Sequence, residues 1–286
     1  MDETQTNNRS AYDKGIGDDL RQIGVVTKYE LLKHIRSKRM VVFVGIAALL
    51  FILITALSII LDGGLPSEKT EFMETYLSMV NLLIVIGVAL FCASTIAAEF
   101  EERTALLMFP RPIKKTSFFL GKVLACYIVC GVIILIYYLA CMLMSLVAAD
   151  GLDMNVFGSL GIAMMFMFGA GGFALLMSSI FKRGAMAVIV TIAVLMLVFN
   201  IVDSMLSMFG TEPIYSITYA AKDIINFISQ NDLHIFYDIG EMVGNPDLDF
   251  VIEDFYPSHL KAFSIAAIWG VVTTTISALL FRRKEF

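Results

Sequence analysis

Charged residues are scarce in this sequence: they make up 16% of its 286 residues, whereas apolar residues make up 58%. A soluble domain usually has about 45–50% apolar and about 25% charged residues, and the mean hydropathy of +0.80 is correspondingly high. The shortage of charge excludes an ordinary soluble domain and indicates a polytopic membrane protein. The net charge of −5 is unevenly distributed along the chain, and we expect no nucleic-acid partner.

A nucleotide-binding loop is also missing. The sequence has no G-x-x-x-x-G-K-[ST] pattern, so the chain cannot cradle ATP phosphates by itself. Its one Gly-Lys pair, Gly121 and Lys122, is followed by Val123 and opens an apolar run. We therefore expect no cofactor on this chain and no enzymatic activity of its own.

Ionisable residues are absent near the middle of every apolar run, and the polar residues Asn81, Asn200 and Asp203 lie near run ends. Proton-coupled and ion-coupled carriers need ionisable groups at membrane depth. This absence disfavours a secondary carrier and predicts an energy source outside the chain.

The four cysteines, Cys92, Cys126, Cys130 and Cys141, all lie in apolar runs without a neighbouring histidine or carboxylate in the sequence. We interpret them as small buried hydrophobic residues rather than as a redox or metal site.

Six apolar runs are each near the ~20 residues that a helix needs to cross a bilayer. They predict an all-α polytopic membrane protein with six transmembrane helices, at residues 40–61, 76–98, 118–147, 156–181, 185–208 and 260–281. The polar residues before the first run carry no cleavage pattern, so we expect the N-terminus to be retained. Residues 1–18 have the composition of a disordered tail.

Residues 19–39 combine apolar residues at helical spacing with interleaved cations. The pattern predicts a basic amphipathic helix that lies in the membrane interface, with Arg36, Lys38 and Arg39 among the lipid headgroups. The alternative is a soluble helix that continues into the first span. Glu30, the lone acid of residues 24–39, is expected to pair with Lys33 or His34.

Cations gather on one side of the predicted topology. Of the 21 Lys and Arg residues, 18 lie in the N-terminal region, in the loop after the second run, after the fourth run and at the C-terminus. Because cytoplasmic loops are rich in Lys and Arg, we expect both termini and the loop 99–117 to be cytoplasmic in a cell-membrane protein, with residues 282–286 as a cytoplasmic tail.

Residues 209–259 then form an extracellular region. An amphipathic helix is predicted after Pro213, a second short helix at 234–243, and a turn at 244–247. The acids Asp247, Asp249, Glu253 and Asp254 could hold Ca²⁺ but lack the spacing of a calcium loop, so we favour a solvated acidic surface.

The fourth run contains Met164, Met165 and Met167, followed by the small residues 169–172. Methionines can bind Cu(I), but neighbouring methionines on a helix point in different directions, which favours flexible packing. The small residues permit either close helix approach or a kink.

The segment from Glu99 to Lys122 is the long charged stretch between two apolar runs. It predicts a short helix at about 101–109, with carboxylates at its start, and membrane-interface cations at Lys114, Lys115 and Lys122. The apolar patch at residues 106–109 is costly on an exposed loop, at ~25 cal/mol per Å². It therefore predicts a docking surface, or alternatively contact with the lipid interface.

This segment resembles that of the membrane subunit of ABC-2 type ABC exporters. The family pattern is approximately Glu-x-Glu-x-Gly-Thr, then Pro eight residues after the Thr, one or two basic residues and a Gly-Lys. Here these positions are Glu99, Glu101, Thr104, Pro112, Lys114, Lys115, Gly121 and Lys122, and Arg103 stands where the family usually has Gly.

The resemblance implies a permease subunit whose coupling helix docks on a separate ATPase subunit, which would hold the ATP and Mg²⁺. It implies a homodimer, or a pair with a related permease, and export of a hydrophobic or amphipathic substrate that the sequence does not identify. The alternative is a membrane anchor or assembly factor that recruits a cytoplasmic partner. The residues expected in ATPase docking are Glu99, Glu101, Glu102, Thr104, Leu106, Phe109, Arg111 and Pro112.

Overall fold

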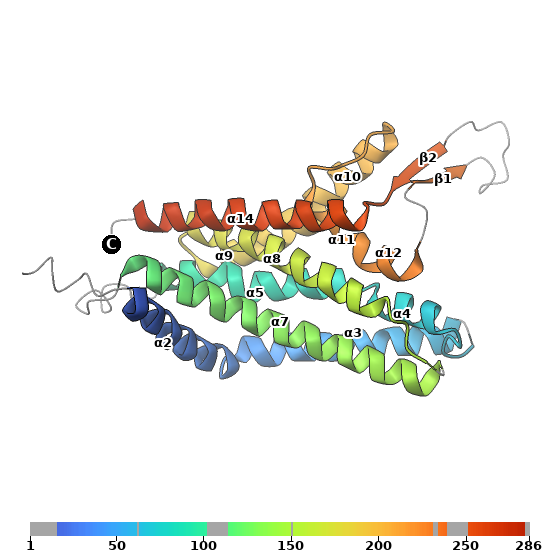
Figure 1. Cartoon of the computed structure of the whole chain (residues 1–286), viewed down its shortest axis with the longest axis horizontal. Helices are drawn as coiled ribbons and strands as arrows, with labels where there is room; N and C mark the ends of the chain where they lie inside the picture. The colour runs from blue at the N-terminus through green and yellow to red at the C-terminus, as the bar shows by residue number, and fades with distance from the viewer. Residues whose placement is uncertain are drawn as a thin grey trace, which may run out of the picture.

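The computed structural model is an elongated bundle of long helices (Figure 1). It describes residues 16–61, 63–101, 114–149, 151–230, 234–238 and 251–283. These ranges contain six helical segments that are long and apolar enough to cross a membrane, which confirms the predicted number of spans. The segments are α3 (Lys38–Leu61), α4 with α5 (Lys69–Leu77 and Val80–Glu101), α7 (Lys115–Ala148), α8 (Val156–Ile180), α9 with η1 and α10 (Gly184–Ala193, Val194–Val198 and Phe199–Met208) and α14 (His259–Arg283).

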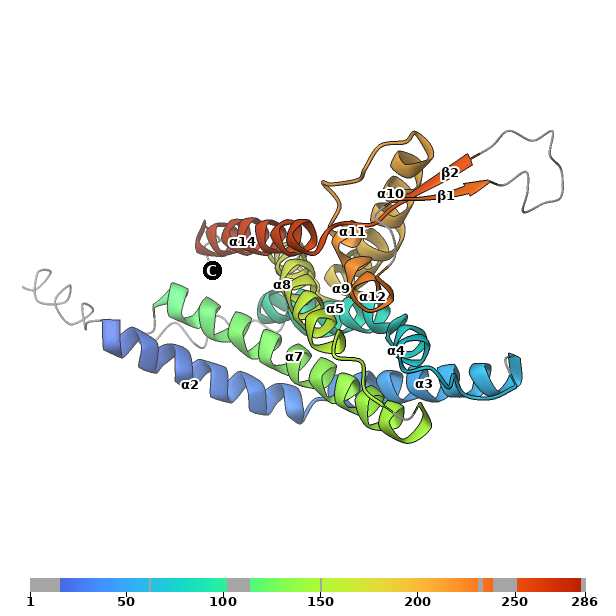
Figure 2. The same cartoon turned by 45° about the vertical axis from the view of Figure 1, so that its right-hand side comes forward.

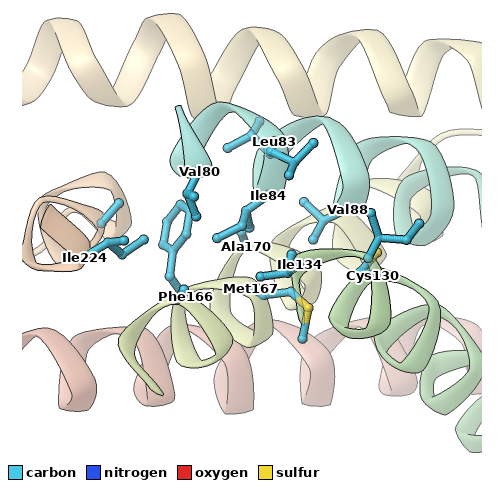
Figure 3. Packing of buried hydrophobic residues seen from close by; sticks show 14 of the residues in the cluster. Val80, Leu83, Ile84, Val88, Cys130, Ile134, Phe166, Met167, Ala170 and Ile224 are labelled. Atoms are coloured by element: carbon cyan, nitrogen blue, oxygen red, sulfur yellow. The ribbon is translucent and has the colours of Figure 1, made fainter. Parts of the chain in front are cut away.

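The second span lies at the centre of the bundle. In its most apolar stretch 72% of the residues are buried, whereas only 11% are buried in the corresponding stretch of α3. α5 packs against α7, α8 and α9, and Figure 3 shows Ile84 and Val88 of α5 facing Ile134 of α7 and Ala170 of α8. The outer spans therefore present most of their apolar surface to whatever surrounds the chain.

α8 remains one uninterrupted helix through its small-residue run, and this run serves close packing. A Cβ added at Gly169 would lie 2.8 Å from the carbonyl oxygen of Ala266, and one at Gly172 would lie 2.9 Å from that of Gly270. Both carbonyls belong to α14, so the absence of side chains lets the two backbones approach closely. Of the two interpretations left open by the sequence, the structure supports close approach. Met167 is buried in the core, as flexible packing predicts.

The two ends of the bundle differ in chemistry (Figure 1). One end, called here the basic end, holds the start of α2 (Ile16–Ile35), the start of α7, the α8–α9 link and the end of α14, with the cations Lys114, Lys115, Lys182, Arg183, Arg282 and Arg283. Two contacts show that these segments meet: Glu101 accepts a hydrogen bond from Gly184 N at 3.0 Å, and the rings of Phe119 and Phe281 lie 5.5 Å apart.

The opposite end, called here the hairpin end, holds α4, α11 (Ile217–Ala221), α12 (Asp223–Ser229) and a two-stranded antiparallel sheet. In this sheet β1 (His234–Asp238) pairs with β2 (Val251–Phe255). The helix expected at 234–243 is thus wrong at 234–238, where aromatic and β-branched residues favour a strand once a partner strand is available. The turn at 244–247, Asp247 and Asp249 lie outside the described residues.

The helix expected after Pro213 is two short helices instead of one. α11 begins at Ile217 and α12 follows after Lys222. Ile217, Ile224 and Ile228 are buried, so the two short helices bury apolar residues as an amphipathic helix would, whereas Ile214 is 40% exposed. α12 ends at Gln230, whose positive φ of 50° is the left-handed conformation common after a helix.

α2 begins at Ile16 rather than at Asp19, so residues 16–18 are helical and not part of a disordered tail. It ends at Ile35, and α3 begins at Lys38 after a break at Arg36 and Ser37. Residues 1–15 lie outside the described residues.

Candidate functional site

α2 packs lengthwise along the first part of α7 (Figures 1 and 2). Four side-chain contacts join residues that are 92–95 positions apart, and their order along both helices shows parallel packing. Asp19 pairs with Lys114 at 2.8 Å, Thr27 donates to the Gly121 carbonyl, Glu30 binds Lys122, and Cys126 Sγ lies 3.7 Å from His34 Nε2. α2 therefore buries one face against its own chain, and its position in the membrane interface stays a prediction.

α2 also keeps an exposed apolar surface outside the contact with α7. Leu20 and Ile35 are 63% and 56% exposed, whereas the polar residues Thr27, Glu30 and His34 are buried. The contact with α7 is made partly by polar groups, which a hydrophobic pattern cannot identify.

Gly121 permits the close approach of α2 and α7. A Cβ at this position would lie 2.7 Å from Val26 Cβ and 3.1 Å from the Ile23 carbonyl oxygen. Real Cβ contacts of 2.7 Å essentially never occur, so a larger residue would push the helices apart. Gly121, the first residue of the Gly-Lys pair, thus has a packing role.

Lys122 lies at the centre of a buried ion cluster, defined here as Glu30, Glu99 and Lys122. The three residues are 7%, 3% and 2% exposed. Lys122 Nζ donates to Glu30 Oε1 and to Glu99 Oε1, the latter at 2.8 Å, and Nζ also lies 4.9 Å from the centre of the Phe118 ring. The cluster joins α2, α5 and α7 where the charged segment leaves α5 and returns to α7.

Two sequence-based expectations are corrected by this cluster. Glu30 binds Lys122 rather than Lys33 or His34, and Lys122 points into the protein interior rather than among lipid headgroups. The reason is electrostatic: a buried carboxylate costs several kcal/mol unless it is paired, and the α7 ammonium satisfies both acids. Lys33 lies 3.6 Å from Glu99 and adds a second, more exposed cation.

Glu99 and Glu101 lie in the last turn of α5, not at the start of a separate helix. Carboxylates are unfavourable at this partially negative helix end, so both need partners elsewhere. Glu99 has Lys122, and the exposed Glu101 accepts a hydrogen bond from the first backbone N–H of α9, at Gly184. Glu101 therefore connects the end of the second span to the start of the fifth.

The other predicted site residues divide into two groups. Arg36, Lys38 and Arg39 are exposed at the junction of α2 and α3, Lys115 is exposed at the basic end, and Lys114 is partly exposed. Residues 102–113 lie outside the described residues; they include Glu102, Arg103, Thr104, Leu106, Phe109, Arg111 and Pro112, and the short helix expected at about 101–109.

The hairpin end carries a second set of polar contacts. Asp223 of α12 is fully buried and lies 2.9 Å from His259 Nδ1 at the start of α14. Burial raises the pKa of this carboxyl, while the hydrogen bond with His259 opposes the shift. Asp254 pairs with Lys222 at 2.6 Å, so this member of the proposed acidic surface has a cationic partner in the protein. The contact between Asp223 and His259 attaches the hairpin end to the last span.

All four cysteines are buried and reduced, as the sequence predicts. The structure adds that Cys126 contacts Thr95 Oγ1 at 3.0 Å and the Phe91 carbonyl at 3.4 Å. Cys126 therefore takes part in the packing of α2, α5 and α7.

The fold defines a polytopic helical membrane protein whose charged segments meet at one end of the bundle. The family model described as ABC-2 family transporter protein matches residues 25–286. The chain therefore belongs to the ABC-2 transporter family, whose members are the membrane subunits of ABC transporters and generally work with an ATPase subunit.

A relative among curated proteins is the "Uncharacterized membrane protein YdbK" of Bacillus subtilis (strain 168). It is 26% identical over 145 residues, which is 48% of this chain. The match spans 58% of the length of that relative, whose name assigns no activity.

Proposed function

We propose that this chain is the permease of an ABC exporter and that it docks on a separate ATPase subunit through the segment between α5 and α7. The family match over residues 25–286 carries the proposal. The ATPase would hold ATP and Mg²⁺, and this chain would have no enzymatic activity of its own. The apolar patch at residues 106–109 suggests Leu106 and Phe109 as the apolar anchors, with the carboxylate of Glu102 and the guanidinium of Arg111 at the rim of the interface.

The contacts at both ends of the segment support a role in transmitting force. The α5 end is attached to α7 and α2 through Glu99 and Lys122, and to α9 through Glu101. A displacement of the segment by the ATPase would therefore move several spans together. The burial of Glu99 removes it from the docking surface, whereas Glu101 remains exposed beside the segment.

The remaining features of the proposal follow from charge and composition. The basic end faces the cytoplasm by the positive-inside rule, so both termini are cytoplasmic and the hairpin end faces outward from the cell membrane. Two permease chains, identical or related, enclose the transport path. The apolar, methionine-containing spans suit a hydrophobic or amphipathic substrate.

Docking can be tested by replacing both apolar anchors with acids. The variant Leu106→Asp/Phe109→Asp is expected to reduce copurification of the ATPase from native membranes by about 10-fold or more, because buried apolar anchors dominate interface energies. A matched control is Tyr215→Asp, an apolar-to-acid change at an 81% exposed position at the hairpin end. Undiminished ATPase association and stimulation in the double variant would overturn docking through this segment.

A further inference from the structure

A cavity of about 210 Å³ with several polar and charged residues in its lining lies at the junction of α2, α3 and α5. Its lining includes Glu30, Lys33 and His34 of α2, Ser37 of the break, Arg39 of α3 and Ser94 of α5. This volume exceeds the ≈30 Å³ that one water molecule occupies in the liquid. A molecular group several times larger than water can therefore enter.

The charges around this cavity do not balance. The lining and its ion partners include three cations, Lys33, Arg39 and Lys122, but only two carboxylates, Glu30 and Glu99. Both carboxylates are bound to Lys122 inside the ion cluster. These described groups therefore carry a net charge of one positive unit. The two cations that line the cavity are Lys33 and Arg39. A singly charged anion would balance the excess.

Hydrogen-bond donors for such an anion are present. The guanidinium of Arg39 has five N–H groups, of which Nη1 donates to Ser94 Oγ and so holds the side chain across the α3–α5 gap. Lys33 is 54% exposed and has its ammonium 3.6 Å from Glu99, beyond hydrogen-bond distance. His34 also lines the cavity, is 7% exposed, and contacts Cys126 through Nε2.

The position of the cavity indicates the source of the anion. Arg39 lies in the first turn of α3, and the next residues on this span, Val41, Val42 and Val44, are 73%, 53% and 47% exposed. An apolar helix exposed in this way faces lipid in a membrane. The cavity therefore lies where the apolar span α3 meets the polar break at Arg36 and Ser37. Lipid phosphates are found at such a boundary in a membrane.

We propose that this cavity binds the phosphodiester of an anionic phospholipid, with Arg39 and Lys33 as the charged ligands. A phosphodiester carries one negative charge, which matches the positive charge left over, and guanidinium groups bind phosphate oxygens through paired N–H donors. The acyl chains would then run along the exposed side of α3. Free phosphate shares this chemistry but lacks the chains. The site does not involve the ATPase, so the proposed lipid binding and the proposed docking can fail separately.

The test uses the full chain purified in an uncharged detergent, with phosphatidylglycerol added and binding measured by native mass spectrometry. Arg39→Gln and, as a second variant, Lys33→Gln are each expected to weaken binding by about 10-fold, the effect of losing one charge-assisted hydrogen bond. The matched control is Arg36→Gln, which removes the same charge three residues earlier, at an exposed position that does not line the cavity. The control is expected to change binding by less than about two-fold.

Two results would overturn the proposal. Equal weakening by Arg39→Gln and Arg36→Gln would mean that the lipid is held only by the general positive charge around the α2–α3 junction. Stabilisation of the lipid-free protein by inorganic phosphate, together with release of phosphatidylglycerol by phosphate, would assign the cavity to free phosphate. Thermal unfolding without lipid checks that each variant is folded; if Arg39→Gln is unfolded, Lys33→Gln decides.

Discussion

The ammonium group of Lys122 joins three helices that are far apart in the sequence. Its two acidic partners belong to α2 and α5, and all three side chains are buried. A buried ion cluster gives little net stability compared with apolar residues, but breaking it by removing one partner is costly because the remaining charges are left unpaired. The cluster is therefore expected to fix how α2, α5 and α7 sit together.

The variant Lys122→Met is expected to lower the free energy of unfolding by about 3–5 kcal/mol, because Glu30 and Glu99 would remain buried without a cation. Denaturant titration of the detergent-solubilised protein measures this. Adding Glu30→Gln and Glu99→Gln to the same variant should restore most of the loss. Lys28→Met, the same change at an exposed position of α2, serves as the control and should stay close to the wild type. A Lys122→Met protein as stable as the wild type would show that the cluster has no structural role.

The partners of individual side chains are the part of the structure that the sequence predicts least well. It marks Gly121 and Lys122 as a pair typical of the family, but it does not reveal that the glycine lies against Val26 or that the lysine binds Glu30. These partners are more than 90 positions away, and no local period connects them. The one available signal is that Glu30 is a lone acid among cations, which indicates a partner without identifying it.

At the scale of helices, the contact between α8 and α14 depends on small residues. A Cβ at Gly172 would lie 2.5 Å from Thr273 Oγ1 and 2.9 Å from the Gly270 carbonyl oxygen. On the same helix, a Cβ at Gly161 would meet nothing within 4 Å. The two glycines therefore form a matched pair.

Gly172→Ala is expected to destabilise the protein by about 1–3 kcal/mol, because a methyl group is forced into a filled contact. Gly161→Ala is expected to be neutral or stabilising by up to about 1 kcal/mol, since alanine is the better helix former. Thermal unfolding of both variants in the same detergent compares them directly. Equal effects of the two substitutions would refute the packing role of Gly172.

Hydropathy predicts the spans well because each span needs about 20 apolar residues to cross the bilayer, whichever helices it packs against. It fails for the short elements at the hairpin end. There β1 depends on a partner strand that begins 13 residues after β1 ends, and α11 and α12 depend on burial against α8 and α14. Such elements are determined by tertiary contacts that override local preference.

For the whole molecule, the segregation of cations gives a topology that can be tested without removing native cysteines. The four natural cysteines are buried, so an introduced cysteine should dominate labelling. In intact cells, a membrane-impermeant maleimide is expected to label Thr211→Cys at the exposed hairpin end and not Lys182→Cys at the exposed basic end. After permeabilisation both should react. Labelling of Lys182→Cys in intact cells would place the basic end outside and exclude cytoplasmic docking.

The fifth span contains a π-helical turn, η1, between α9 and α10. After Gly184, its buried residues recur at multiples of four, at Ala187, Thr191 and Leu195 and then at Asp203 and Ser207. In a pure α-helix with 3.6 residues per turn, each step of four turns the stripe by ~40°, so it would wind away from the bundle. A π turn takes up one more residue than an α turn and corrects this winding. If the same residues adopted plain α-helical geometry throughout, α10 would be rotated by ~100° relative to α9, which would turn the carboxylate of Asp203 away from the protein, where it is now buried.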